Sequence, residues 1–277
     1  MPTALFLSPH LDDVAFSCGG TLVKLAAAGW HCVLATAFTR SVPHPAGFAL
    51  KCQTDKGLSP EVDYLAVRRA EDAEFGRVVG AAEVLWLDFP EAPHRGYDSA
   101  AELFAGVRPG DDVADAVARA VLDLWRRVSP ELVFAPQGLG NHADHLQLIA
   151  AVTATLPADA VTWYRDTPYA LRGPADSPGF GVPIGDHLAV KLDGCAAYRT
   201  QLGFQFGGEA GMREALAAFA LREGDAAGLA GAAERYRGRP VEPGQTTPPR
   251  RPAPTPSRSP RLAPVARPRP GDPSRTG

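Results

Sequence analysis

The sequence predicts an α/β fold in which an open, largely parallel sheet has helices on both faces. Short apolar runs alternate with longer segments of helical periodicity through most of the 277 residues, a rhythm typical of strand–helix–strand units. The hydrophobic fraction of 45% is enough for one sizeable domain. Polar clusters follow two of the apolar runs, and ligands of open parallel sheets bind beyond the carboxyl ends of the strands.

The expected strands are short apolar runs that end at turn residues or at polar side chains. They cover residues 3–8, 31–38, 83–88, 131–135, 160–164 and 187–192. The expected helices have apolar residues spaced near 3.6. They cover residues 14–29, 63–80, 111–127, a segment that begins after Asn141, 194–203 and 211–222. The loops over 40–62 and 89–110 are expected to wall a pocket.

The chain changes character at residue 238. Residues 1–237 form the predicted domain, whereas residues 238–277 are dense in proline and arginine and carry only Glu242 and Asp272 as acids. Such a segment has too little apolar surface to fold and too much proline for a helix or a sheet. We therefore predict a disordered C-terminal tail.

The overall composition argues against several classes of protein. The net charge of −3 disfavours a general nucleic-acid binder. No apolar stretch approaches the roughly 20 residues that span a bilayer, and residues 1–13 lack the pattern of a secretory leader. The four cysteines are scattered without a CxxC pair, which favours reduced thiols. We expect a cytoplasmic protein that binds neither nucleic acid nor membranes; its oligomeric state stays open.

Two polar clusters follow the first and the fourth predicted strand. They consist of His10, Asp12 and Asp13 in the first cluster and of His142, Asp144 and His145 in the second. Adjacent carboxylates repel each other, and burying either one without a partner is expensive. Because parallel strands end at the same edge of a sheet, the two clusters are expected to meet there, where a divalent cation would neutralise one of the acids.

Three of these side chains match the requirements of a catalytic zinc site. Such a site needs three nitrogen or oxygen ligands and one open position. His10 and Asp13 are three residues apart on a turn that enters a helix, so they can converge on one ion. We predict that His10, Asp13 and His145 hold one Zn²⁺ per chain.

The remaining polar side chains are assigned to chemistry around the metal. Asp12 points away from the ligand direction, so it is predicted to be the general base for a metal-bound water. His142 is predicted to face the same cavity and to stabilise an oxyanion or protonate a leaving group, as an imidazolium. Asp144 is predicted to orient a histidine from outside the ligand set. No GxGxxG or GxxxxGK[ST] motif is present, which disfavours a nucleotide enzyme.

The two clusters resemble the motifs of the PIG-L/LmbE-like zinc-dependent de-N-acetylases. HLDDV at residues 10–14 is similar to the first family motif, His-Pro-Asp-Asp-Glu, and HADH at residues 142–145 is similar to the second, His-x-Asp-His. Arg68 and Glu71 are similar to an Arg-x-x-Glu pair on a helix of that family. The resemblance covers about residues 3–222.

The resemblance implies a Rossmann-like fold, one zinc ion and the hydrolysis of an acetamide. It implies that Asp12 is the general base and that His142 assists the oxyanion, and it adds a contact between Arg68 and the substrate. The metal ligands that it implies are His10, Asp13 and His145. The implied enzyme is a zinc-dependent N-deacetylase, a hydrolase of linear amide C–N bonds that removes the acetyl group from an N-acetylglucosaminyl-type conjugate by attack of metal-bound water. The expected partner is this small N-acetylated molecule.

Two positions depart from the family pattern, and two alternatives follow. Leu11 and Val14 replace the usual proline and glutamate. Neither is a predicted ligand, so metal binding should survive, but the missing glutamate removes an acid from the pocket and leaves the sugar substrate open. One alternative is an amidase that cleaves a larger acyl or thiol-conjugate amide at the same site. The other is a metal-binding module without turnover, which would need neither Asp12 nor His142.

Overall fold

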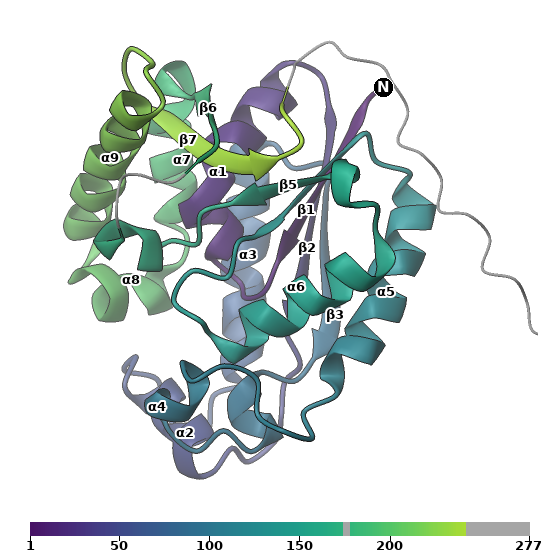
Figure 1. The fold of residues 1–277 in the computed structure, drawn as a ribbon. Helices are drawn as coiled ribbons and strands as arrows, with labels where there is room; N and C mark the ends of the chain where they lie inside the picture. Colours follow the sequence, from purple (N-terminus) through teal and green to yellow (C-terminus); the bar gives the residue numbers. More distant parts are fainter. Residues whose placement is uncertain (174–177, 242–277) are drawn as a thin grey trace, which may run out of the picture.

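The structure, a computed structural model, describes residues 1–173 and 178–241. Over these residues the sheet has seven strands in the order β3-β2-β1-β4-β5-β7-β6 (Figure 1). Neighbouring strands among β1 to β5 pair in parallel, whereas β7 is antiparallel to both β5 and β6. The strands are β1 (Thr3–Ser8), β2 (His31–Phe38), β3 (Glu83–Phe89), β4 (Leu132–Pro136), β5 (Val161–Tyr164), β6 (Phe180–Pro183) and β7 (Ala233–Gly238). The predicted α/β class is confirmed.

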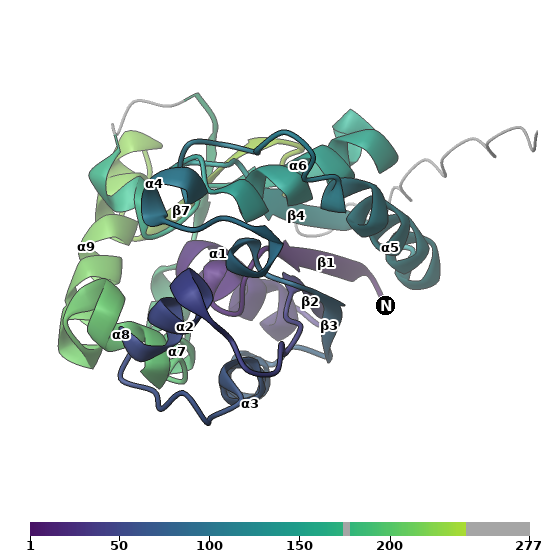
Figure 2. The ribbon, with the colours of Figure 1, turned by 90° about the horizontal axis from the view of Figure 1, so that it is seen from below.

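Helices cover both faces of the sheet. The α-helices of the described residues, including those that lie beyond the strand ends, are α1 (Asp13–Ala27), α2 (Gly47–Thr54), α3 (Tyr64–Val79), α4 (Ala100–Leu103), α5 (Val113–Val128), α6 (Ala143–Thr155), α7 (Leu188–Cys195), α8 (Arg199–Phe206) and α9 (Glu209–Ala226). Alternate residues of β1 enter two cores. Ala4 and Phe6 pack with residues of α1 and α3, and Leu5 and Leu7 pack with residues of α5 and α6. Figure 2 shows β1 to β3 between these two sets of helices.

One predicted strand is wrong. Residues 187–192 belong instead to a 3₁₀ turn (Gly185–His187) and to α7. The short run LAVKLDGC fits either period, but its buried residues, Lys191, Gly194 and Cys195, have helical spacing. A Cβ at Gly194 would lie 2.7 Å from Val79, so α7 packs closely on α3 there. The predicted helix over 194–203 is accordingly divided between the end of α7 and α8.

Two strands and one eight-residue helix were not predicted. β7 reads AERYRG, whose charged residues obscure the strand pattern; its Glu234 is buried and accepts hydrogen bonds from Gly20 N, Thr21 N and Lys191 Nζ. The expected loop over 40–62 contains α2. Residues 242–277, nearly all of the predicted tail, lie outside the described residues. None of the helices in the described part of the chain is both long and apolar enough for a membrane span.

A buried carboxylate in α3 links pH to stability. Asp72 is 1% exposed and accepts hydrogen bonds from Tyr198 Oη at 2.6 Å and from Trp86 Nε1 at 2.9 Å. Burial raises the pKa of Asp72 to about 6 even though both hydrogen bonds lower it. The folded protein therefore holds this proton more tightly than the unfolded chain does, and this stabilisation is lost as the pH rises through about 6.

We expect the free energy of unfolding of the wild type, measured relative to that of Asp72→Asn, to fall by about 1 kcal/mol between pH 5 and pH 7. Other titrating groups are common to both proteins, so they cancel in this difference. Urea unfolding at the two pH values measures it. A difference that does not change with pH would show that Asp72 titrates alike in the folded and unfolded states.

Candidate metal centre and active site

The two polar clusters meet because β1 and β4 are neighbours. The two strands pair in parallel, with Phe6 opposite Phe134, so both chains leave the sheet at the same edge. The first cluster occupies the turn from β1 into α1. The second opens α6, where His142 is the N-cap residue and its Nδ1 accepts a hydrogen bond from Asp144 N at 3.2 Å. Segments more than 130 residues apart are thereby brought into contact.

The three predicted metal ligands converge. Their candidate ligand atoms all lie within 4.8 Å of one another. Asp13 Oδ2 is between the two imidazoles, 3.3 Å from His10 Nδ1 and 3.3 Å from His145 Nε2. All three side chains are almost fully enclosed, with His145 completely buried.

The outward nitrogens of both histidines are held by carboxylates. His10 Nε2 lies 2.9 Å from Asp144 Oδ2, and His145 Nδ1 lies 2.6 Å from Asp166 Oδ1. A carboxylate that accepts the outer N–H leaves the inner nitrogen as a lone-pair donor, which is the tautomer of a metal-ligating histidine. In agreement, His145 Nε2 is buried and has no hydrogen-bond partner among the described residues. This donor set fits a Zn²⁺ ion.

The electrostatics of this cluster favour a cation. Burial lowers the pKa of His10 and of His145, but Asp13 and the carboxylates behind the rings outweigh it and raise the two values to about 9 and about 10. Burial likewise raises the pKa of Asp13 and of Asp144, yet the adjacent imidazoles hold both well below the usual range. Buried carboxylates thus concentrate negative potential between the rings, which a divalent ion relieves.

Asp144 and Asp166 are themselves fixed in place. Asp144 Oδ1 accepts a hydrogen bond from Arg95 Nη1 at 2.7 Å, and its Oδ2 accepts one from Ala92 N. Asp166 Oδ2 accepts hydrogen bonds from Gly138 N and Leu139 N. Asp144 therefore contacts the outer nitrogen of His10 from a fixed position; the orienting role predicted for it stays a prediction.

Neither Asp166 nor Arg95 was predicted to be part of the site. Asp166 follows the end of β5, so the strand-end signal that identified the other two clusters also pointed to it. Arg95 is one of two arginines in the 89–110 loop, and no pattern around it distinguishes it from a surface arginine.

Asp12 lies beside the metal ligands and faces the cavity. Its Oδ1 is 3.3 Å from Arg68 Nη2, and its Oδ2 accepts a hydrogen bond from Gln205 Nε2 at 3.0 Å. Burial raises the pKa of Asp12 to about 6, against the lowering effect of Arg68. Gln205, from α8, was not predicted.

Arg68 is buried in a network of its own. It donates to Glu91 Oε1 at 3.1 Å and to Leu11 O at 2.9 Å, in addition to its pairing with Asp12. These contacts hold the guanidinium against the general-base candidate. The contact between Arg68 and a substrate stays a prediction.

His142 completes the ring of polar groups. Its ring centroid is 4.8 Å from that of His10. Burial, followed by the nearby charge of His10, lowers the pKa of His142 to about 3. The imidazole is therefore neutral, and because Nδ1 accepts the Asp144 N–H, Nε2 carries the proton.

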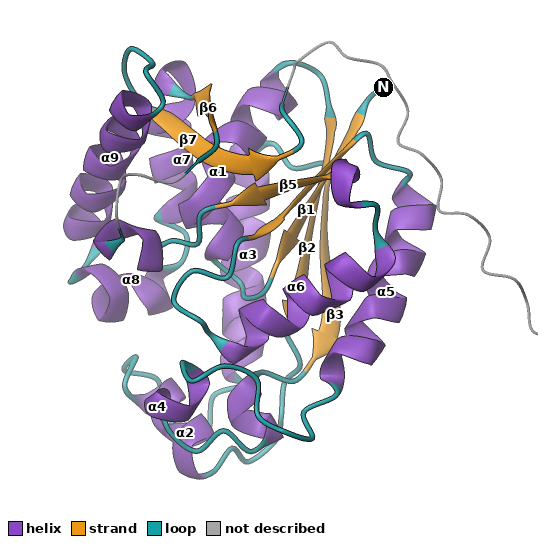
Figure 3. Ribbon diagram, in the orientation of Figure 1, coloured by secondary structure: helices purple, strands orange, loops and turns teal. Residues whose placement is uncertain are grey.

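A cavity of about 350 Å³ adjoins these groups. Figure 3 shows α2 and α4 beyond the carboxyl ends of the strands, where the two long loops contribute walls to it. Further lining comes from α8 and from Pro168 and Tyr169. The cavity has the size of a small-molecule site.

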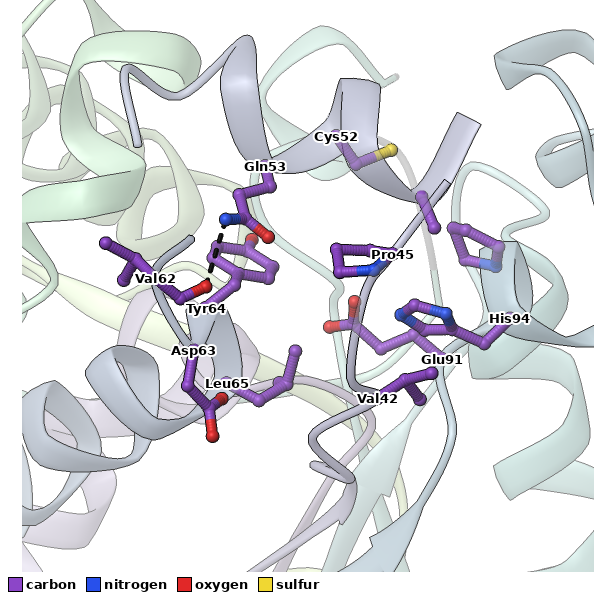
Figure 4. A pocket seen from close by; sticks show the side chains of 12 residues that line it. Val42, Pro45, Cys52, Gln53, Val62, Asp63, Tyr64, Leu65, Glu91 and His94 are labelled. Atoms are coloured by element: carbon purple, nitrogen blue, oxygen red, sulfur yellow. Dashed lines mark hydrogen bonds between the residues drawn. The ribbon is translucent and has the colours of Figure 1, made fainter. Parts of the chain in front are cut away.

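A second, much smaller pocket lies next to it (Figure 4). Its volume of about 30 Å³ suits a water molecule rather than a substrate. Gln53 spans its edge by donating a hydrogen bond to Val62 O. The pocket shares four lining residues with the large cavity, so it lies behind one wall of it; they are Cys52, Tyr64, Glu91 and Pro93.

Two curated relatives are similar in sequence. A 2'-N-acetylparomamine deacetylase from Streptomyces fradiae is 38% identical over 168 residues, which cover 60% of this chain and 57% of the relative. A 2'-N-acetylparomamine deacetylase from Niallia circulans is 33% identical over 188 residues, which cover 60% of this chain and 66% of the relative. The chain therefore spans less than two thirds of the length of either.

The fold is also similar to a solved structure. The zinc-inhibited form of teicoplanin deacetylase superposes with a TM-score of 0.68 at 23% identity, over 84% of this chain and 96% of that one. A family model, described as GlcNAc-PI de-N-acetylase, matches residues 5–156. This match includes both polar clusters and more than half of the 277 residues. The protein belongs to the PIG-L family.

Proposed function

We propose that this protein is a zinc-dependent hydrolase that removes the acetyl group from an N-acetylated amino-sugar conjugate. The observation that carries the proposal is the pairing of two carboxylate-held histidines with Asp13, next to Asp12 and a cavity of about 350 Å³. Membership of the PIG-L family supports it. So do the names of the relatives, which are deacetylases of an N-acetylated amino sugar, and the zinc-inhibited form of the similar structure.

His10, Asp13 and His145 would hold the metal ion. When bound, the ion supplies Lewis acidity that polarises the acetamide carbonyl and makes a water molecule more acidic. Asp12 takes a proton from the attacking water. Its pKa of about 6 leaves it mostly ionised at neutral pH, yet close enough to the working pH for the proton to be passed on.

Arg68 and Gln205 keep Asp12 in one orientation, so its free lone pairs stay directed at the cavity. His142 donates a hydrogen bond from its Nε2–H to the carbonyl oxygen as negative charge develops there, and it keeps this proton throughout. It acts as a neutral donor, which differs from the imidazolium expected from the sequence. Asp12 then returns its proton to the departing amine, and acetate and the free amine leave.

The test is product analysis with the zinc-loaded protein. We expect stoichiometric acetate and free amine from N-acetylglucosaminyl conjugates, and we expect a chelator to abolish both products and added Zn²⁺ to restore them. Acetate measured by a coupled assay and amine measured by a fluorogenic reagent give independent readouts. Release of amine only from substrates with longer acyl groups would contradict the deacetylase and identify the broader amidase.

A further inference from the structure

Two large aromatic side chains are exposed at the cavity. Phe204, on α8, is 65% exposed, and Phe104, directly after α4, is 41% exposed; both line the cavity. A single exposed apolar residue needs no explanation, but two rings that border the same substrate-sized cavity favour an apolar group of the ligand. Phe104 also packs edge-on to Tyr169, with ring centroids 5.7 Å apart, so the aromatic surface continues into the cavity.

One ammonium group is held beside one of these rings, that of Phe204. Lys56 Nζ donates a hydrogen bond to Cys52 O at 2.8 Å and lies 5.2 Å from the ring centroid of Tyr64 and 5.4 Å from that of Phe204. This contact joins the segment that follows α2 to α8, which carries Phe204. The side chain is half-buried, so the charge is held at the cavity rather than free in solvent.

Lys56 is not paired with a carboxylate among the described residues. Its neighbour Lys51 pairs with Asp55 at 2.9 Å, but Lys56 makes no ion pair within residues 1–173 and 178–241. The contacts with two ring faces and a carbonyl oxygen orient the ammonium without neutralising it. An anionic group beside Phe204 would therefore meet an ordered ammonium that no carboxylate of the described residues pairs with.

We propose that Phe204, Phe104 and Lys56 form a subsite for the part of the substrate that is not acetylated, and that this part is an apolar or aromatic group bearing a negative charge. The inference rests on the proposed function, because that function places the acetamide at Asp12. Aromatic rings and one ammonium group match such an anionic ring system. A substrate with several free amines would instead bring like charges to Lys56.

The experiment uses four N-acetyl-β-glucosaminides, with methyl, phenyl, 4-carboxyphenyl and 4-(aminomethyl)phenyl as the aglycone. We expect kcat/KM for the phenyl glycoside to exceed that for the methyl glycoside about tenfold, the scale of burying one aromatic ring against another. We expect the carboxylate to add about threefold to fivefold and the amine to remove about as much, as for partly exposed ion pairs. Added salt should reduce the charge preference.

Two variants assign these preferences to residues. Lys56→Met is expected to abolish the preference for the carboxylate, whereas Lys24→Met, which changes the net charge equally away from the cavity, is expected to keep it. Phe204→Ala is expected to abolish the preference of phenyl over methyl. Leu221→Ala, at an exposed apolar residue that does not line the cavity, is the matched control.

Calorimetric titration of the same glycosides separates this inference from the proposed function. The expected order of binding without any acetate release would support the subsite and overturn the deacetylase. Turnover of all four glycosides at equal kcat/KM, or a preference for the aminomethyl compound, would overturn the subsite and support the deacetylase. If none of the four is bound or hydrolysed, both proposals are wrong.

Discussion

Replacement of His145 by alanine is expected to give a protein that no longer retains zinc through dialysis. The change removes Nε2, one of the two imidazole nitrogens that face Asp13 Oδ2 at 3.3 Å, and leaves only His10 and Asp13 as ligands. Metal content by atomic absorption and the zinc dissociation constant by competition with a chelator measure the effect. The loss of zinc affinity should exceed the roughly 10–100-fold loss that follows the removal of a group that hydrogen-bonds to a ligand from behind.

Asp166→Asn provides the graded comparison. It keeps His145 but replaces the carboxylate 2.6 Å from His145 Nδ1 with a neutral amide. We expect about 10–100-fold weaker zinc binding at an unchanged stoichiometry. Circular dichroism of the metal-free proteins monitors folding, since His145→Ala also removes the imidazole partner of Asp166 and one of the two imidazole partners of Asp13, both buried carboxylates. A folded His145→Ala protein with one zinc per chain would show that this residue is not a ligand.

The parallel half of the fold was predictable because four of its five strands, β1, β2, β4 and β5, are almost fully buried. Such strands read as nearly continuous apolar runs, and β1, β2 and β5 were found within one residue of their observed bounds. β7 was not predicted because a buried charged residue within it is paired with groups far away in the sequence, and no local pattern reveals such pairing. Its Glu234 accepts hydrogen bonds from residues more than 200 positions earlier. α7 was predicted as a strand because a run of eight residues with few turn signals fits both the helical and the strand period.

The site was predictable to the extent that it is local in sequence. His10 and Asp13, and likewise His142 and His145, are each three residues apart, so a short motif contains them. Other groups that contact the site residues are far away in the sequence and belong to neither motif. Gln205 reaches Asp12 from 193 positions away, and such partners are found only when the chain is folded.

Replacement of Asp12 by asparagine is expected to lower turnover roughly 10²–10⁴-fold without removing the metal, the range over which general acid–base groups act. Asparagine keeps the size of the side chain beside Arg68 and Gln205, but it cannot accept and return a proton. The predicted metal ligands do not include Asp12, so zinc content should stay at the wild-type value. Single-turnover kinetics with zinc-loaded protein measure the chemical step.

The pH profile gives this variant a second readout. In the wild type, kcat/KM is expected to rise with pH as Asp12 loses its proton, with a midpoint near 6, because burial raises its pKa to about that value. Asp12→Asn removes the base and therefore this limb of the profile. Asp123→Asn, an equal change of charge at an exposed residue of α5, is expected to keep both the rate and the limb. Wild-type turnover in zinc-loaded Asp12→Asn would exclude Asp12 as the base.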